Sequence, residues 1–157
     1  MKPRSIIVIV SAIVAAIAFA ATTHTSAGAA GTASTSPTFT LAAPPGGTTT
    51  SLDLGKKGIS PGDEFVTTNG PLVRVGSSIR VGRIDAIETS MSATRSRLQL
   101  SAQLARGTLE VDGVYDPNHP RSALPLVGGT ASFAGARGTV VLSTSGHAAT
   151  LTFHLDR

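Results

Sequence analysis

Alternation of apolar and polar residues marks most of the second half of this 157-residue chain. In residues 97–105, leucine and alanine alternate with arginine, glutamine and serine. Residues 108–114 and 148–155 alternate in the same way. A period of two places every second side chain on one face of an extended chain, so each segment is predicted to be a strand with one buried face.

Turn-forming residues divide the chain after residue 38 into further strand-like segments. Clusters of Pro, Gly, Asn and Asp separate these segments, and nothing between them is long and periodic enough for a substantial helix. Residues 90–97 are expected to form a loop. The predicted strands span residues 39–43, 51–54, 64–68, 78–88, 97–105, 108–114, 124–127, 139–143 and 148–155.

This number of short strands predicts an all-β domain, either a two-layer sandwich or a closed barrel. Closure into a barrel would remove the unpaired edges that a sheet otherwise exposes. An eight-stranded barrel is also just wide enough to hold one small ligand. The alternation alone leaves sandwich and barrel open.

The first 37 residues have a different composition. Lys2 and Arg4 precede the apolar run 6–21, which ends in small residues, so residues 1–21 are predicted to be a signal peptide with a helical core, cleaved near Ala20 or Ala21. The alternative is a retained membrane anchor, but the run is shorter than the roughly 20 apolar residues that a spanning helix needs. We therefore expect a secreted, extracellular protein with no stable membrane anchor after cleavage.

Residues 22–37 are nearly all Thr, Ser, Ala and Gly. Such a composition buries too little apolar surface to offset the entropy lost on ordering, so this stretch is predicted to be a disordered leader. The folded domain is expected to span residues 38–157.

Charge and cysteine content narrow the functional classes. The net charge is +4, and removal of Lys2 and Arg4 with the signal leaves eleven basic against nine acidic residues, or about +2. The remaining basic residues are scattered, and the chain has one Tyr and no Trp, so nucleic-acid binding has little support. Without cysteine, stability must come from the packed core and not from disulfides.

Four segments carry a resemblance to known proteins. Residues 62–69 (GDEFVTTN), 81–86 (VGRIDA), 107–115 (GTLEVDGVY) and 124–138 (LPLVGGTASFAGARG) follow one another in the chain. Segments of this kind occur in the same order in dirigent proteins and allene oxide cyclases, which the domain therefore resembles. The resemblance implies one eight-stranded antiparallel β-barrel. Within 124–138, the paired glycines Gly128 and Gly129 are expected to allow close strand approach, and Phe133 is expected to plug one barrel end.

The resemblance also implies candidate site residues. Asn69 and Tyr115 match the asparagine and the tyrosine that serve allene oxide cyclases, which hold a fatty-acid epoxide in an apolar tunnel. The acidic residue of the family's first strand has no counterpart here, and the cyclase cysteine is absent. Asn69 precedes Gly70-Pro71, where a turn asparagine needs no functional explanation.

Strand carboxylates supply the other candidates, because dirigent proteins, which steer the coupling or cyclisation of reactive intermediates, in some cases use acidic pocket residues. A carboxylate in an apolar pocket would have a raised pKa and could act as an acid, although strand acids more often lie on an exposed face. An arginine could bind an anionic group of a ligand. The weak catalytic candidates are Asn69, Tyr115, Glu110 and Asp85, and the ligand-binding candidates are Asn69, Arg83, Asp112, Tyr115 and Phe133.

Searches for other chemistry are negative. The four histidines show no metal-ligand spacing, and no phosphate loop, dinucleotide fingerprint or nucleophile elbow occurs, so we expect neither metal nor cofactor. The sequence predicts a secreted barrel that binds a small apolar organic molecule and steers its cyclisation or coupling, as an isomerase or cyclase would. The alternative is a non-catalytic extracellular ligand-binding or structural barrel. Proteins of the related families are usually trimers, so the resemblance also suggests a homotrimer.

Overall fold

The computed structural model describes residues 37–156, which form one antiparallel sheet of nine strands. The predicted signal peptide (residues 1–21) and the leader (residues 22–37, except Pro37) lie outside the described residues. Within the described range, no helix has the length and apolar character needed to cross a membrane. The strands are β1 (Thr38–Ala43), β2 (Thr48–Leu52), β3 (Glu64–Arg74), β4 (Arg80–Ser92), β5 (Arg95–Leu104), β6 (Gly107–Tyr115), β7 (Arg121–Gly129), β8 (Gly138–Ser145) and β9 (Ala148–Leu155).

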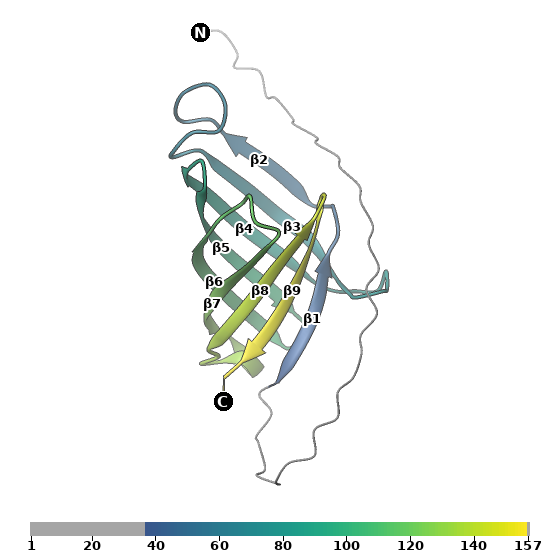
Figure 1. Cartoon of the computed structure of the whole chain (residues 1–157). Coiled ribbons are helices and arrows are strands. Elements are labelled where there is room, and N and C mark those ends of the chain that lie inside the picture. The colour runs from purple at the N-terminus through teal and green to yellow at the C-terminus, as the bar shows by residue number, and fades with distance from the viewer. Residues whose placement is uncertain (1–36, 157) are drawn as a thin grey trace, which may run out of the picture.

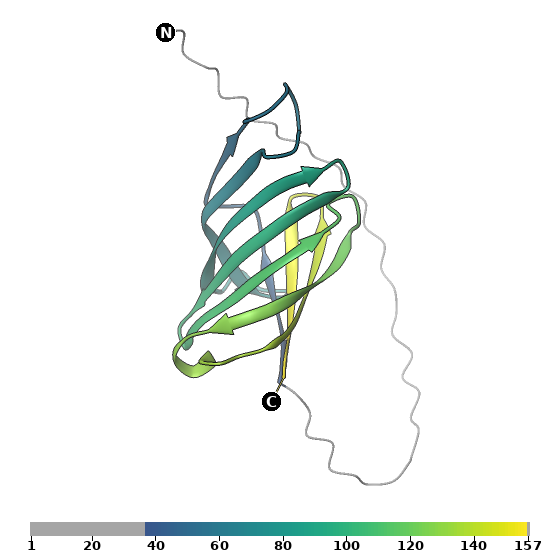
Figure 2. The same cartoon turned by 90° about the vertical axis from the view of Figure 1, so that its left-hand side faces the viewer.

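Eight of these strands close into the predicted barrel (Figure 1). Consecutive strands from β3 to β9 pair as neighbours, β9 pairs with β1, and β1 pairs with the end of β3. Figure 2 shows the strands slanting across the barrel axis, as closure of a sheet requires. The closed barrel confirms the prediction and excludes the two-layer sandwich.

Strand β2 extends the sheet beyond the barrel. It pairs only with the first half of β3, whereas β1 pairs with the second half, so β1 and β2 read as one strand interrupted by Pro44-Pro-Gly-Gly47. Gly47 has a φ of 80°, and a Cβ there would lie 2.7 Å from the backbone nitrogen of Gly70. The break therefore requires glycine where the chain crosses β3.

Two sequence expectations about strand length were wrong. The predicted strand 64–68 continues to Arg74, because Asn69 adopts a φ of 55° and sits in a β-bulge instead of ending the strand. The loop expected at 90–97 is a tight hairpin, since β4 runs to Ser92 and β5 starts at Arg95. Both errors came from treating turn-type residues as strand breakers.

The core fills the barrel lumen. Its side chains come from every barrel strand, and apolar residues alternate with outward-facing polar ones, as the sequence predicted for 97–105, 108–114 and 148–155. The whole core lies within residues 41–153. Its fully or nearly fully buried members include Leu72, Ala102, Leu109, Leu124, Leu126, Val140, Leu151 and Phe153.

One end of the barrel is closed by aromatic rings. Phe133 belongs to a short 3-10 helix, η1 (Ala131–Phe133), between β7 and β8. Its ring lies 6.5 Å from that of Phe39, which stacks on Phe153 at 4.9 Å between ring centroids. A Cβ on Gly129 would collide with the carbonyl of Phe133, so this glycine is what lets η1 fold tightly against the strand. The expected role of Phe133 as an end plug is thus seen in the packing.

Candidate functional site

The opposite end of the barrel is open and carries a cavity. This is the end at which β2, the β2–β3 loop and the β4–β5, β6–β7 and β8–β9 turns lie (Figure 1). The cavity has a volume of about 480 Å³ and reaches from the β1–β2 break to lumen-facing positions of β3, β4 and β9. We call it the mouth cavity; its lining residues are Ala43, Pro44, Pro45, Gly46, Thr49, Thr67, Gly70, Ile84, His147 and Ala149.

Tyr115 and Glu88 provide the titratable groups of the lumen at this end. Tyr115 pairs with Ser96, and Glu88 pairs with Leu98 two residues further along β5. Because Leu98 is a core residue and residues two apart share a face, both side chains lie on the lumen face. Burial, with the Glu88 carboxylate as a second cause, raises the pKa of Tyr115 well above its ordinary value. Tyr115 is therefore a protonated phenol at any physiological pH.

Buried polar residues gather at the same end. Among the described residues, the buried polar or charged side chains are Asp63, Ser90 and Ser96. Ser90 and Ser96 are register partners on β4 and β5, one step beyond Glu88 toward the barrel end. The open end of the lumen therefore carries polar groups on its β4, β5 and β6 side, whereas the closed end is lined by aromatic and aliphatic side chains.

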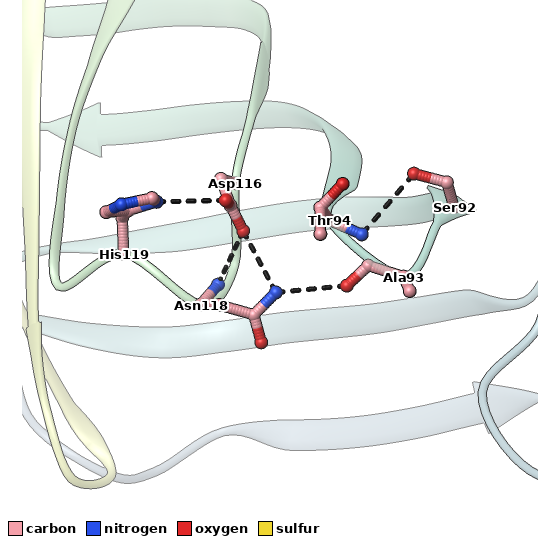
Figure 3. Close-up of polar contacts among 6 residues, drawn as sticks. All are labelled: Ser92, Ala93, Thr94, Asp116, Asn118 and His119. Atoms are coloured by element: carbon pink, nitrogen blue, oxygen red, sulfur yellow. Dashed lines mark hydrogen bonds and ion pairs between the residues drawn. The ribbon is translucent and has the colours of Figure 1, made fainter.

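Hydrogen bonds fix the rim beside Tyr115 (Figure 3). Asp116 Oδ1 accepts bonds of 2.9 and 3.0 Å from the backbone N–H and the Nδ2 of Asn118, and its Oδ2 lies 2.9 Å from Nδ1 of His119. Asn118 Nδ2 also donates to the Ala93 carbonyl at 3.0 Å. The backbone bond from Asn118 is the main reason that the pKa of Asp116 is lowered. These contacts join the β6–β7 loop to the β4–β5 turn and hold the chain just after Tyr115.

Most of the other candidates lie on the outer face of the barrel. Asp85 and Glu110 both neighbour Ser101, which alternates with the core residues Leu100 and Ala102 on β5. Glu110 accepts a bond of 3.0 Å from the Ser101 hydroxyl. Asp85 and Glu110 therefore point away from the lumen.

Asn69 and Arg83 belong to a polar network around Asp85 on that face. Asp85 accepts the backbone N–H of Asn69 at 2.7 Å and Nε2 of Gln103 at 2.7 Å. Arg80 donates to Oδ1 of Asn69 at 2.9 Å, and Arg83 donates to Oε1 of Gln103 at 2.8 Å. The network holds the bulge in β3, which accounts for Asn69 in structural terms.

Asp112 is engaged by an arginine. Arg97 contacts both of its carboxylate oxygens, at 2.8 and 2.6 Å, and this pairing lowers the pKa of Asp112. Asp85, Glu110 and Asp112 together border an outer groove of about 450 Å³ with Val66, Ile87 and Val127. The structure thus places three candidate carboxylates along one groove outside the barrel, Tyr115 inside the open end, and Phe133 in the closed end.

Glu88 was missed by the sequence reasoning. The signal was present, because Ile84, Ala86 and Glu88 are spaced two apart and share a strand face. Tracing that face would have placed one carboxylate in the lumen and Asp85 outside it. Within residues 37–156, no group of three or more His, Asp or Glu side chains is placed to hold a metal ion.

Comparisons with known proteins agree on the fold. No protein-family model and no curated protein sequence matches the chain. A solved structure described as pyocyanin demethylase superposes with a TM-score of 0.66 at 19% identity, over 76% of this chain and all of that chain. The pterocarpan synthase dirigent proteins PsPTS1 and GePTS1 both give a TM-score of 0.60, at 17% and 18% identity. The matches cover 77% and 76% of this chain, and 95% and 84% of those chains. The chain has a dirigent-like barrel fold.

The open end of this dirigent-like barrel offers a limited set of chemical abilities. The phenol of Tyr115 hydrogen-bonds to the Glu88 carboxylate, which leaves the phenol oxygen and the second carboxylate oxygen as acceptors. The mouth cavity is bordered mainly by Ala, Pro, Gly, Ile and Thr, so it can take an apolar molecule with few polar groups.

Proposed function

We propose that this dirigent-like barrel binds a small apolar organic molecule at its open end and steers the molecule's cyclisation or coupling. In this proposal the guest occupies the mouth cavity, and displacement of the core side chains beside the cavity brings it to Tyr115 and Glu88, which lie on the lumen face but do not line the cavity. The observation that carries the proposal is the difference between the ends: one has a cavity and the lumen's titratable groups, and the other is filled by stacked phenylalanines.

Steering requires little catalytic equipment. Holding a reactive molecule in one conformation lowers the activation free energy, because the entropy is lost on binding and not in the reaction step. In the best-oriented cases this effect reaches roughly 7–11 kcal/mol. The single phenolic proton of Tyr115 is donated to Glu88, so the phenol oxygen and the second carboxylate oxygen of Glu88 would accept hydrogen bonds from a guest hydroxyl. The scarcity of lumen-facing acids and bases is consistent with this mode of action.

The structural neighbours support a small-molecule role without naming the guest. One is named for the demethylation of pyocyanin, and two are named as pterocarpan synthases. At 17–19% identity these likenesses show the fold alone, so the guest of this barrel is a separate question. Export, suggested by the composition of residues 1–21, and a trimeric state, raised by the family resemblance, belong to the same proposal.

The test separates the lumen from the outer groove. The protein is purified from its exported fraction, its small-molecule contents are extracted and identified by mass spectrometry, and turnover of each captured molecule is assayed. Glu88→Gln and Tyr115→Phe should each reduce capture or turnover at least about tenfold, whereas Asp85→Asn and Glu110→Gln on the outer face should not. The reverse pattern would overturn the proposal.

The same experiment distinguishes steering from plain binding. A captured molecule that returns with an altered ring or stereocentre shows steering. A molecule returned unchanged, with binding still dependent on Glu88 and Tyr115, shows the non-catalytic alternative. Light scattering of the purified protein tests the trimer separately.

A further inference from the structure

The loop between β2 and β3 exposes apolar side chains to an unusual degree. Leu54 is 66% exposed and Ile59 is 76% exposed, the two highest values among the large hydrophobic residues of the described chain. Lys56 and Lys57 lie between them, also exposed. Residues 54–59 (LGKKGI) therefore present two apolar side chains on either side of two positive charges; we call this segment the LGKKGI loop.

A buried carboxylate, that of Asp63, holds the two ends of this loop together. Asp63 accepts the backbone N–H of Leu54 at 2.8 Å with one oxygen and that of Ser60 at 2.6 Å with the other. The Gly62 N–H donates to the Ser90 carbonyl and the Ser90 N–H donates to the Asp63 carbonyl, both at 2.8 Å, which ties the end of the loop to β4. The bonds from Ser60 and Leu54 lower the pKa of Asp63, which keeps the carboxylate charged. These bonds fix both ends of the loop, so residues 54–59 project from the barrel in a defined position.

The loop and the mouth cavity share one end of the barrel. Both views show the loop projecting past the turns of that end, beyond the tip of β2 (Figures 1 and 2). Leu52 on β2 is exposed next to it. Whatever surface the loop contacts therefore faces the end through which a guest would enter.

We propose that the LGKKGI loop docks the barrel on an anionic lipid surface, with Leu54 and Ile59 entering the headgroup region and Lys56 and Lys57 paired with lipid phosphates. Apolar side chains beside lysines are the composition by which peripheral proteins bind such surfaces. The six residues of the LGKKGI loop offer too little area for a stable protein interface, which buries on the order of 1,000 Å² or more. A lipid surface needs no matching shape.

This docking extends the proposed function, because the open end would then face the phase in which apolar molecules dissolve. The inference does not depend on guest binding, since it rests on the loop alone. Vesicle binding measured without any guest therefore tests it separately: loss of docking leaves the guest site untouched, and loss of guest binding leaves docking untouched.

The experiment measures binding to vesicles. The protein is residues 37–157, which contain all the strands and the core that the structure describes; leaving out the apolar run 6–21 prevents that run from binding lipid itself. Cosedimentation with phosphatidylcholine vesicles containing phosphatidylglycerol should show binding, with much weaker binding to phosphatidylcholine alone. Raising the salt concentration should weaken binding, because screening reduces the contribution of the lysines.

Two loop variants and one matched control identify the contact. Leu54→Ser/Ile59→Ser and Lys56→Gln/Lys57→Gln should each weaken binding to anionic vesicles by roughly tenfold or more. The control is Val75→Ser/Ile79→Ser, which removes a similarly exposed apolar pair (58% and 62%) from the β3–β4 turn at the opposite end. Loss of binding in the control with retention in the loop variants would overturn the proposal, as would equal binding to neutral vesicles. Absence of vesicle binding by the unaltered protein would overturn it as well.

Discussion

The two ends of the barrel are built from the same strands but from different residue types. At the closed end, Phe39, Phe133 and Phe153 stack in a row, and the polar groups face outward. At the open end, Tyr115 and Glu88 lie on the lumen face, and the cavity reaches inward from the β1–β2 break. The lumen faces of β4, β5 and β6 therefore change from apolar packing toward the closed end to polar contact at the open end.

Under the proposed function, this difference separates the part of the barrel that stabilises the fold from the part that binds a guest. Aromatic packing at one end closes the lumen and contributes to stability through buried apolar area. The other end is then free to leave a cavity and to bury polar groups, which cost stability unless they find partners. Variants at the closed end should therefore unfold the protein, and variants at the open end should change what it binds.

The largest effect is expected for Phe153→Ala. Phe153 is fully buried and stacks on Phe39, so its truncation removes apolar contacts and leaves a cavity, at a cost of about 3–5 kcal/mol in the free energy of unfolding. The matched control is Phe65→Ala at the open end. Phe65 is only half-buried on β3, so this substitution should lower the free energy of unfolding by less. Urea denaturation followed by far-UV circular dichroism measures both. Equal losses of unfolding free energy in the two variants would contradict the view that the closed end contributes more to stability than the open end.

The paired glycines sharpen the same point. A Cβ on Gly129 would lie 2.8 Å from the Thr108 carbonyl and would collide with that of Phe133, whereas a Cβ on Gly128 would meet nothing within 4 Å. Gly129→Ala should therefore destabilise the protein by roughly 1–3 kcal/mol through overpacking. Gly128→Ala should change the unfolding free energy by less than about 0.5 kcal/mol. A neutral Gly129→Ala would show that the η1 corner does not depend on this close approach.

At the open end, the titration of Tyr115 reports the lumen environment directly. The chain has one Tyr and no Trp, so tyrosinate absorbance belongs to this residue alone. Burial first, and the Glu88 carboxylate second, raise its pKa in the folded protein, so little tyrosinate should form near pH 10, where a free tyrosine is half ionised. Glu88→Gln should lower the Tyr115 pKa partway, because the burial remains.

The raised pKa also sets the direction of a stability change. Above about pH 10 the unfolded chain loses the tyrosine proton while the folded protein keeps it, so the folded state binds more protons and stability falls as pH rises. The Tyr115→Phe variant should lose this part of the alkaline decline. Titration of Tyr115 at its ordinary pKa in the folded protein would place the phenol in solvent and remove it from the site.

The smallest effect is expected on the outer face. The Arg97–Asp112 pair joins two exposed or half-exposed side chains, and pairs of this kind contribute little to stability. Asp112→Asn should leave the midpoint of urea unfolding unchanged within error, at low and at high salt. A clear loss of stability would mean that the outer groove has a structural role that its exposure does not indicate.

The fold could be predicted from the sequence to a large extent. Alternation in 97–105, 108–114 and 148–155 fixed strands with one buried face, and the family resemblance selected the barrel over the sandwich. The strand ends were less predictable, because Asn69 and the Ser and Thr residues near 90–94 are tolerated in a bulge and a tight hairpin. Which strands pair at closure is a long-range property that local patterns do not carry.

The positions of the candidate site residues were harder to predict than the strands, for a reason of geometry. Asp85, Glu110 and Asp112 were chosen by residue type. They alternate along their strands with core residues, so their side chains point outside the barrel. Tyr115 was chosen by resemblance and lies on the lumen face, while Glu88 was overlooked although it follows Ile84 and Ala86 at a spacing of two. Whether any of these residues binds or acts on a guest stays a prediction.

The most direct test of the central claim is a titration with the neutral fluorescent probe N-phenyl-1-naphthylamine. The probe should bind the unaltered barrel, and Ala149→Trp, which fills the mouth cavity, should weaken that binding at least about tenfold. Thr49→Trp at the exposed rim guards against a folding defect in the first variant and should have the same effect. Ile87→Trp, which fills the outer groove instead, should leave binding unchanged. Loss of binding in Ile87→Trp with retention in the two mouth variants would contradict the account.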